Sequence, residues 1–138
     1  MKARIGICAA ALALGGVAAG CGGGDEGRDS EAAEHAATPQ RAIAEIAEVR
    51  DGLATALATY RSGRRAAADE QVGDAYLEHF ELVEGPLEEA DEELNEALED
   101  GIRERLREQM RDGAPVARVE RLVRKLDAQL DEAAAALQ

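Results

Sequence analysis

The sequence has very few aromatic residues. Tyr60, Tyr76 and Phe80 are the whole set, and there is no tryptophan. A core without large rings has to be built mainly from alanine and leucine. This favours close-packed helices, because alanine has the highest helix propensity. No stretch has the alternating pattern that is typical of strands. The composition therefore predicts an all-α fold.

Basic residues are also scarce. The chain has 16 Lys and Arg against 29 Asp and Glu, which gives a formal net charge of −13. Binding to nucleic acid or to anionic lipid headgroups requires clustered Lys and Arg to neutralise phosphates, so neither is expected as a partner. The acidity is compatible with a cation ligand, with a basic protein partner, or with solubility alone.

The N-terminus has the layout of a secretory signal peptide. Lys2 and Arg4 precede an apolar stretch from Ile5 to Ala19. This stretch is shorter than the ~20 apolar residues of a membrane-spanning helix and is diluted by glycines. The segment Ala18-Ala19-Gly20-Cys21 resembles the lipobox of bacterial lipoproteins, in which the cysteine is diacylglycerylated.

This resemblance predicts a lipoprotein signal peptide over residues 1–20 and lipidation of Cys21. The mature protein would then be extracytoplasmic and anchored to the bacterial cell membrane through its lipid, in the periplasm or elsewhere in the cell envelope. An ordinary signal peptide with an incidental cysteine is the other interpretation. Because the remaining cysteine, Cys8, would leave with the signal peptide, the exported domain has no disulfide.

The sequence also lacks the patterns of common active sites. Beyond residue 21 its serines are Ser30 and Ser62, and neither lies in a GxSxG turn. The two histidines do not form an HExxH pair, and no glycine-rich phosphate-binding loop follows a strand. An enzyme is therefore not expected.

Residues 21–38 contain the predicted lipidated cysteine and a segment rich in Gly, Asp and Glu. Without apolar periodicity this segment cannot bury enough surface to offset the entropy of ordering, so we expect a flexible tether. Thr38 is a suitable N-cap, and Pro39 suits the first position of a helix. The folded domain is therefore predicted to span residues 39–138.

Four runs of apolar residues with spacings of three and four follow in this domain, which is the helical period. The runs are Ile43, Ile46, Val49, Leu53, Leu57 and Tyr60; Val72, Tyr76, Phe80 and Val83; Leu87, Ala90, Leu94, Leu98, Ile102, Leu106 and Met110; and Val116, Val119, Val123, Leu126, Leu130, Ala133 and Leu137. Gly63, Gly85-Pro86 and Gly113 separate them. The pattern predicts an antiparallel up-and-down four-helix bundle. At Gly85-Pro86, the proline either begins a new helix or kinks a long one.

An acidic series accompanies the second run. Glu78, Glu81 and Glu84 are three residues apart, so neighbouring members approach each other on a helix and repel. A bound cation would relieve this repulsion, and hard cations prefer oxygen ligands. His79 lies on the flank of the same buried stripe. The alternative interpretations are a solvated acidic face, a histidine paired with a neighbouring side chain, and a core position for Tyr76 with its hydroxyl at the rim.

Two segments together resemble the extracytoplasmic helical region that accompanies some Ftr-type high-affinity iron permeases. They are Leu57-Ala58-Thr59-Tyr60-Arg61-Ser62-Gly63 and Ala75-Tyr76-Leu77-Glu78-His79-Phe80-Glu81-Leu82-Val83-Glu84-Gly85-Pro86-Leu87. The later parts of the pattern match Glu99, Gly113-Ala114-Pro115 and Val119-Glu120-Arg121-Leu122, so the resemblance covers about residues 45–135. It implies a module that assists iron uptake by binding the cation or by docking on a permease.

Residue by residue, the resemblance implies metal ligands at five positions. Glu81, Glu84 and Glu99 are the first candidates, followed by His79 and Glu78. The segment from Arg103 to Glu108 comes close to the REXXE motif of iron permeases, but Arg107 stands in place of the second glutamate. We interpret that segment as a solvated face and exclude it as a site.

The leading functional hypothesis is a lipid-anchored, non-enzymatic accessory protein of iron or other cation uptake. No membrane span follows the bundle within the sequence, so the resemblance implies an accessory separate from the permease. The first alternative is a structural or protein-interaction lipoprotein that presents an acidic helical surface to a partner and has no metal site. A sensor-like ligand-binding domain is the third hypothesis.

Overall fold

The computed structural model describes residues 38–138, and this part is all-α, as the composition predicts. Its segments are α2 (Pro39–Arg61), α3 (Arg65–Ala75), the π-helical η1 (Tyr76–Phe80), α4 (Glu81–Ala90), α5 (Glu92–Glu99), the π-helical η2 (Asp100–Leu106), α6 (Arg107–Arg111) and α7 (Val116–Ala136). The predicted signal peptide over residues 1–20, Cys21 and the tether up to residue 37 lie outside the described residues.

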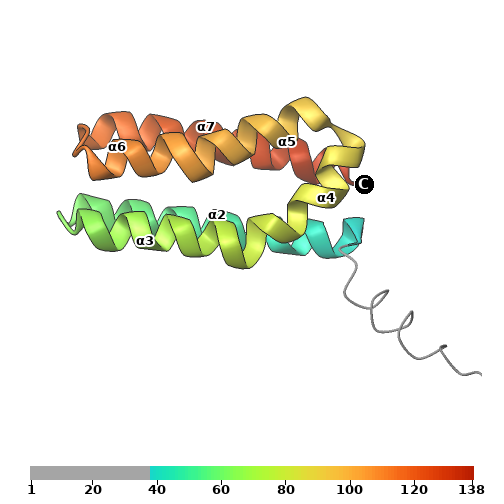
Figure 1. Cartoon of the computed structure of the whole chain (residues 1–138), viewed down its shortest axis with the longest axis horizontal. Helices are drawn as coiled ribbons and strands as arrows, with labels where there is room; N and C mark the ends of the chain where they lie inside the picture. The colour runs from blue at the N-terminus through green and yellow to red at the C-terminus, as the bar shows by residue number, and fades with distance from the viewer. Residues whose placement is uncertain (1–37) are drawn as a thin grey trace, which may run out of the picture. The chain divides into compact units, whose positions relative to one another are not determined.

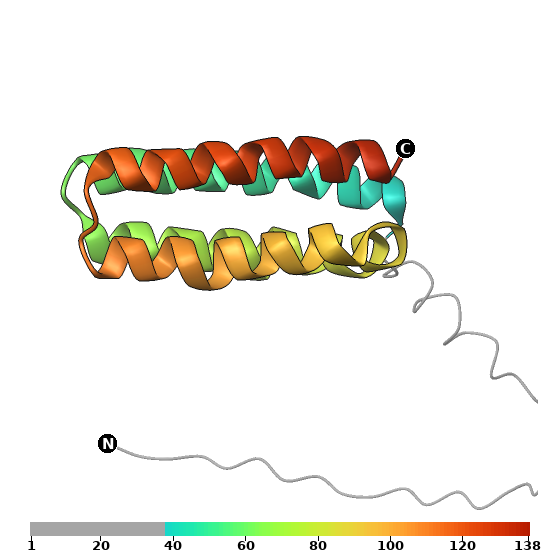
Figure 2. The same ribbon diagram turned by 90° about the horizontal axis from the view of Figure 1, so that it is seen from above.

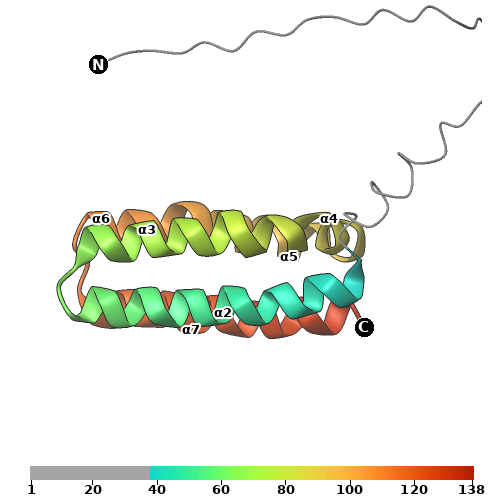
Figure 3. The same ribbon diagram turned by 90° about the horizontal axis from the view of Figure 1, so that it is seen from below.

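The segments join into four helical rods (Figure 1). The first rod is α2, the second is α3 with η1 and α4, the third is α5 with η2 and α6, and the fourth is α7. Figures 2 and 3 show the rods lying side by side. Contacts link α2 to α3 and α7, α3 to α6, and α5 to α7, so each rod packs on the one before it and α7 packs back on α2.

The first rod begins and ends as its sequence predicts. The Thr38 hydroxyl accepts a hydrogen bond from the Arg41 backbone N–H at 3.2 Å, and Pro39 takes the first helical position. After Arg61 the chain turns at Gly63, whose φ of +85° is a conformation that favours glycine. At the same end the Tyr60 hydroxyl donates to the carbonyl of Ala114 at 2.6 Å, which ties the first rod to the turn before α7.

Of the two possibilities that the sequence leaves open at Gly85-Pro86, the start of a new helix is wrong. Pro86 lies inside α4, which continues to Ala90. A proline normally disfavours a helical conformation at the preceding residue because its ring meets that residue's Cβ, and Gly85 has none. The break falls instead at Asp91, which leaves helical geometry and accepts the Leu94 N–H at 3.0 Å as the N-cap of α5.

Gly101 allows the third rod to approach α7 closely. It is buried within η2, and a Cβ at this position would lie 2.5 Å from Cδ2 of Leu126. The sequence predicts fraying or a bend at this glycine. The structure shows a π-helical stretch, in which the chain gains one residue per turn relative to an α-helix.

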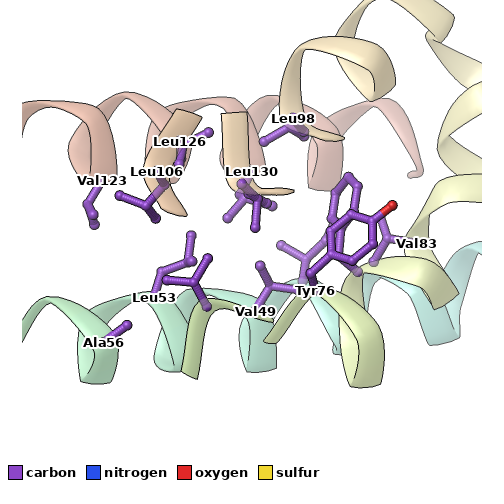
Figure 4. Close-up of a cluster of buried hydrophobic side chains, with 14 of the residues drawn as sticks. Val49, Leu53, Ala56, Tyr76, Val83, Leu98, Leu106, Val123, Leu126 and Leu130 are labelled. Atoms are coloured by element: carbon purple, nitrogen blue, oxygen red, sulfur yellow. The ribbon is translucent and has the colours of Figure 1, made fainter. Parts of the chain in front are cut away.

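The core runs along the inside of the four rods. Figure 4 shows Val49 and Leu53 of α2 facing Leu126 and Leu130 of α7, with Leu98 and Leu106 of the third rod beside them. Phe80, Leu87, Leu98, Ile102, Leu106, Met110, Leu126 and Leu130 are fully buried. Within residues 38–138, none of the helices is both long enough and apolar enough to span a membrane.

A tyrosine-centred candidate site

Tyr76 lies where α3 passes into the π-helical η1. Its side chain is at the edge of the core, 7% exposed, with its ring 5.7 Å from that of Phe80 between centroids. Figure 4 shows Tyr76 beside Val83 at the end of the buried cluster. The hydroxyl donates a hydrogen bond to Oε1 of Glu84 at 2.5 Å. The glutamate is thus held against the rim of the core.

The third rod contributes a second carboxylate and a cation. The guanidinium of Arg103 lies over the Tyr76 ring, 5.9 Å from its centroid, and Nη1 of Arg103 donates to Oε1 of Glu99 at 2.8 Å. We call Tyr76, Glu84, Glu99 and Arg103 the tyrosine cluster. The cluster therefore combines a carboxylate that is hydrogen-bonded to the phenol, Glu84, with an ion pair of the third rod whose guanidinium lies over the phenol ring.

The electrostatics of the cluster act mainly on the phenol. Burial raises the pKa of Tyr76 well above its usual range, and the hydrogen bond to Glu84 raises it further. The negative charges of Glu84 and Glu99 act in the same direction, while Arg103 opposes them. The cluster therefore holds the Tyr76 proton firmly.

The raised pKa of Tyr76 predicts a loss of stability at alkaline pH. In the unfolded chain this phenol ionises near pH 10, whereas the folded chain keeps it protonated. Its contribution to stability is therefore complete below about pH 10 and falls as the pH rises further, by up to about 1.4 kcal/mol per pH unit. Urea denaturation between pH 8 and 11 measures the slope. Tyr76→Phe should flatten it, and an unchanged slope in that variant would contradict the assignment.

The structure places His79 away from the tyrosine cluster. Its Nδ1 lies 2.9 Å from Oε2 of Glu45 in α2, and the other oxygen of Glu45 lies 3.6 Å from Nε of Arg41. His79 thus takes part in a contact between the first and second rods. Its role as a metal ligand remains a prediction of the sequence resemblance.

Within the described residues, neither Glu78 nor Glu81 takes part in the hydrogen bonds and the ion pair of the cluster. Glu78 faces a groove of about 280 Å³ between α2 and the second rod. The lining of this groove includes the carboxylates of Glu48, Asp51, Asp74 and Glu78, together with His79. Glu81 is exposed at the start of α4. Glu78 lies within the π-helical η1, whereas Glu81 and Glu84 follow it in α4, so a regular period of 3.6 residues does not relate Glu78 to the other two.

Of the five positions implied by the sequence, Glu84 and Glu99 are the ones that the structure connects to Tyr76. Glu84 accepts the hydrogen bond of the phenol, and the negative charge of Glu99 contributes to raising the pKa of Tyr76. In the part of the chain that the structure describes, no three His, Cys, Asp or Glu side chains are grouped closely enough to hold a metal ion. Any cation at this place would need the Tyr76 oxygen as well.

Two residues of the cluster were not predicted as site residues. The sequence interpretation treated Tyr76 as a core residue and set aside the segment containing Arg103. The separation of four between Glu99 and Arg103 was the available signal for that pair.

Comparison with known proteins adds no assignment: no family model, curated protein or solved structure matches the chain. The resemblance to the region that accompanies iron permeases rests on its sequence motif alone.

Proposed function

We propose that this protein is a lipid-anchored extracytoplasmic accessory of iron or other cation uptake, and that it binds a hard cation at the tyrosine cluster. The observation that supports this proposal is the hydrogen bond from the Tyr76 hydroxyl to Glu84, beside the ion pair of Glu99 and Arg103, whose guanidinium lies over the same ring. Phenol and carboxylate oxygens suit hard cations such as Fe³⁺ or Mn²⁺, and water would complete the coordination shell.

Binding in this form releases a proton. A cation bound to the phenol oxygen lowers the pKa of Tyr76 and displaces the proton now donated to Glu84. The affinity for the cation should therefore rise with pH. The oxygens of Glu84 would then be free to coordinate the metal or to accept hydrogen bonds from its bound waters. No other chemistry is required of the protein, which would act as a carrier site and not as an enzyme.

The fold and the anchor support an accessory role. We propose an antiparallel up-and-down bundle, since the turns after α2 and α6 lie at one end of the ribbon and the bend between α4 and α5 at the other (Figures 1 and 3). A lipid on Cys21 and a tether up to residue 38 would hold this bundle within about 20 Å of the membrane, near a permease.

Isothermal titration calorimetry tests the cation site. The chain from residue 21 onward, with Cys21→Ser to prevent lipidation, is titrated separately with Fe³⁺-citrate, Fe²⁺, Mn²⁺ and Ca²⁺. Tyr76→Phe and Glu84→Gln should each weaken binding by at least about tenfold, because each removes a ligand oxygen or its charge. A visible charge-transfer band with Fe³⁺ that is lost in Tyr76→Phe would identify the phenolate as a ligand.

Glu81→Gln is the matched control. It removes the same charge from the same helical segment as Glu84→Gln, but at an exposed position outside the cluster. We expect it to weaken binding much less than Glu84→Gln does, because Glu81 would act on the cation only through its charge and not as a ligand. Equal losses in both variants would show that the overall acidity of the surface, and not the cluster, is responsible for binding.

Protein interaction is the second candidate, and the acidic groove favours it. Glu48, Asp51, Asp74 and Glu78 line one concave surface between α2 and the second rod. Such a surface complements a basic segment of a partner protein, for example on a permease. Titrations that give no heat with any of the four cations would reject the cation site and favour this interpretation.

A further inference from the structure

We infer that Arg103 is an internal counter-cation that competes with the bound metal and sets the affinity of the tyrosine cluster. This inference rests on the proposed cation site. The observation behind it is that a positive charge already lies among the ligand groups. One nitrogen of the Arg103 guanidinium is 2.8 Å from a carboxylate oxygen of Glu99, and the group covers one face of the Tyr76 ring.

The pairing of Arg103 is suited to displacement. Its side chain is 56% exposed, and its partner Glu99 is 37% exposed. An ion pair at this exposure is weak, because water competes for both groups and long side chains lose entropy when held in place. Arg103 can therefore leave Glu99 for solvent when a cation of higher charge arrives. The carboxylate that it releases becomes a metal ligand.

The neighbouring arginines do not share this position. Arg105 of η2 pairs with Asp100, and Arg107 of α6 donates to Asp69 of α3 at 2.9 Å. Asp100 and Glu104 line a shallow depression together with Glu99 and Arg103. Arg103 is thus the cation of η2 that contacts the Tyr76 ring, and removing it leaves an acidic surface around the phenol.

The expected effect follows from the charge that is removed. A divalent cation and a guanidinium about 5–6 Å apart in water repel each other by an energy that corresponds to roughly a tenfold change in binding constant. Arg103→Gln should therefore tighten binding of Mn²⁺ or Fe²⁺ by about tenfold, and binding of Fe³⁺ by more. Arg103→Lys keeps the charge and should stay close to the unmodified chain.

The test is calorimetric titration of the chain from residue 21 with Cys21→Ser, using Mn²⁺ and Fe²⁺ as probes. Arg105→Gln is the matched control, because it removes the same charge from the same η2 segment at a similar exposure, 54%. We expect tighter binding in Arg103→Gln and little change in Arg105→Gln. Thermal melts of each variant establish that the bundle remains folded.

The outcomes separate this inference from the proposed function. Binding that depends on Tyr76 but is equal or weaker in Arg103→Gln would overturn the role of Arg103 and leave the cation site standing. Equal tightening in Arg103→Gln and Arg105→Gln would also overturn it, because the effect would then be one of net charge. No binding in either the unmodified chain or Arg103→Gln would overturn both.

Discussion

Replacing Phe80 with alanine is expected to lower the free energy of unfolding by about 3–5 kcal/mol. Phe80 is fully buried and is the single phenylalanine in the sequence. Its loss removes the contact with the Tyr76 ring and leaves a cavity that the surrounding rods can close only in part. Urea denaturation followed by far-UV circular dichroism gives the change directly.

Leu77→Ala is the control for this prediction. Leu77 lies in the same π-helical segment, but its side chain is 60% exposed. Its truncation should change the free energy of unfolding by no more than about 0.5 kcal/mol. A loss below about 1 kcal/mol in Phe80→Ala would show that the register of η1 differs from the one described. Comparable losses in the two variants would lead to the same conclusion.

The second large effect is expected at Gly52, where α2 passes close to Ala75 of α3. A Cβ at position 52 would lie 2.7 Å from the Cβ of Ala75, which is a short side chain and cannot rotate away. Gly52→Ala therefore has to push the first two rods apart. We expect a net loss of about 1–3 kcal/mol from overpacking, even though alanine is favoured over glycine inside a helix by about 1 kcal/mol.

Gly73→Ala provides the matched comparison, because this glycine also lies inside an α-helix. A Cβ there would meet the guanidinium carbon of Arg107 at 3.5 Å, an ordinary van der Waals distance. The helix preference should then dominate, and Gly73→Ala should stabilise the protein by about 0.5–1 kcal/mol. Thermal and urea denaturation of both variants measure the difference. A stabilising Gly52→Ala would contradict the close approach of α2 and α3.

Much of the fold was predictable from local signals in the sequence. The spacing of apolar residues placed Val49, Phe80, Leu106 and Leu130 on buried faces, and all four are buried. Thr38 and the glycines at the two turns marked ends of helices, because caps and left-handed turns depend on a few neighbouring residues. Such signals act over one turn of helix and do not need the rest of the protein.

The position of the helix boundary in the second rod was mispredicted because two local signals competed there. Gly85-Pro86 suggested either a helix end or a kink, and the helix in fact continues through Pro86, since Gly85 has no Cβ to clash with the proline ring. Leu87, on the far side of the proline, is fully buried and holds α4 in place up to Asp91. The N-cap of Asp91 was the stronger signal for the boundary.

The candidate site was only half predictable. The sequence resemblance pointed first to Glu81, Glu84 and Glu99 and then to His79 and Glu78. The acidic series did not distinguish Glu84 from Glu78 and Glu81. Which of these five groups meet depends on the π-helical turn in the second rod and on how the third rod packs against it. A projection with a constant helical period cannot show either effect.

The sequence by itself determined that this chain forms helices, where most of their ends lie, and that its surface is acidic, because composition, caps and apolar spacing act locally. The tertiary structure decided which charges are neighbours. It placed the guanidinium of Arg103 over the Tyr76 ring of another rod, and it placed His79 beside Glu45 of the first rod. Electrostatic interactions depend on distances in space, and packing of the rods sets those distances.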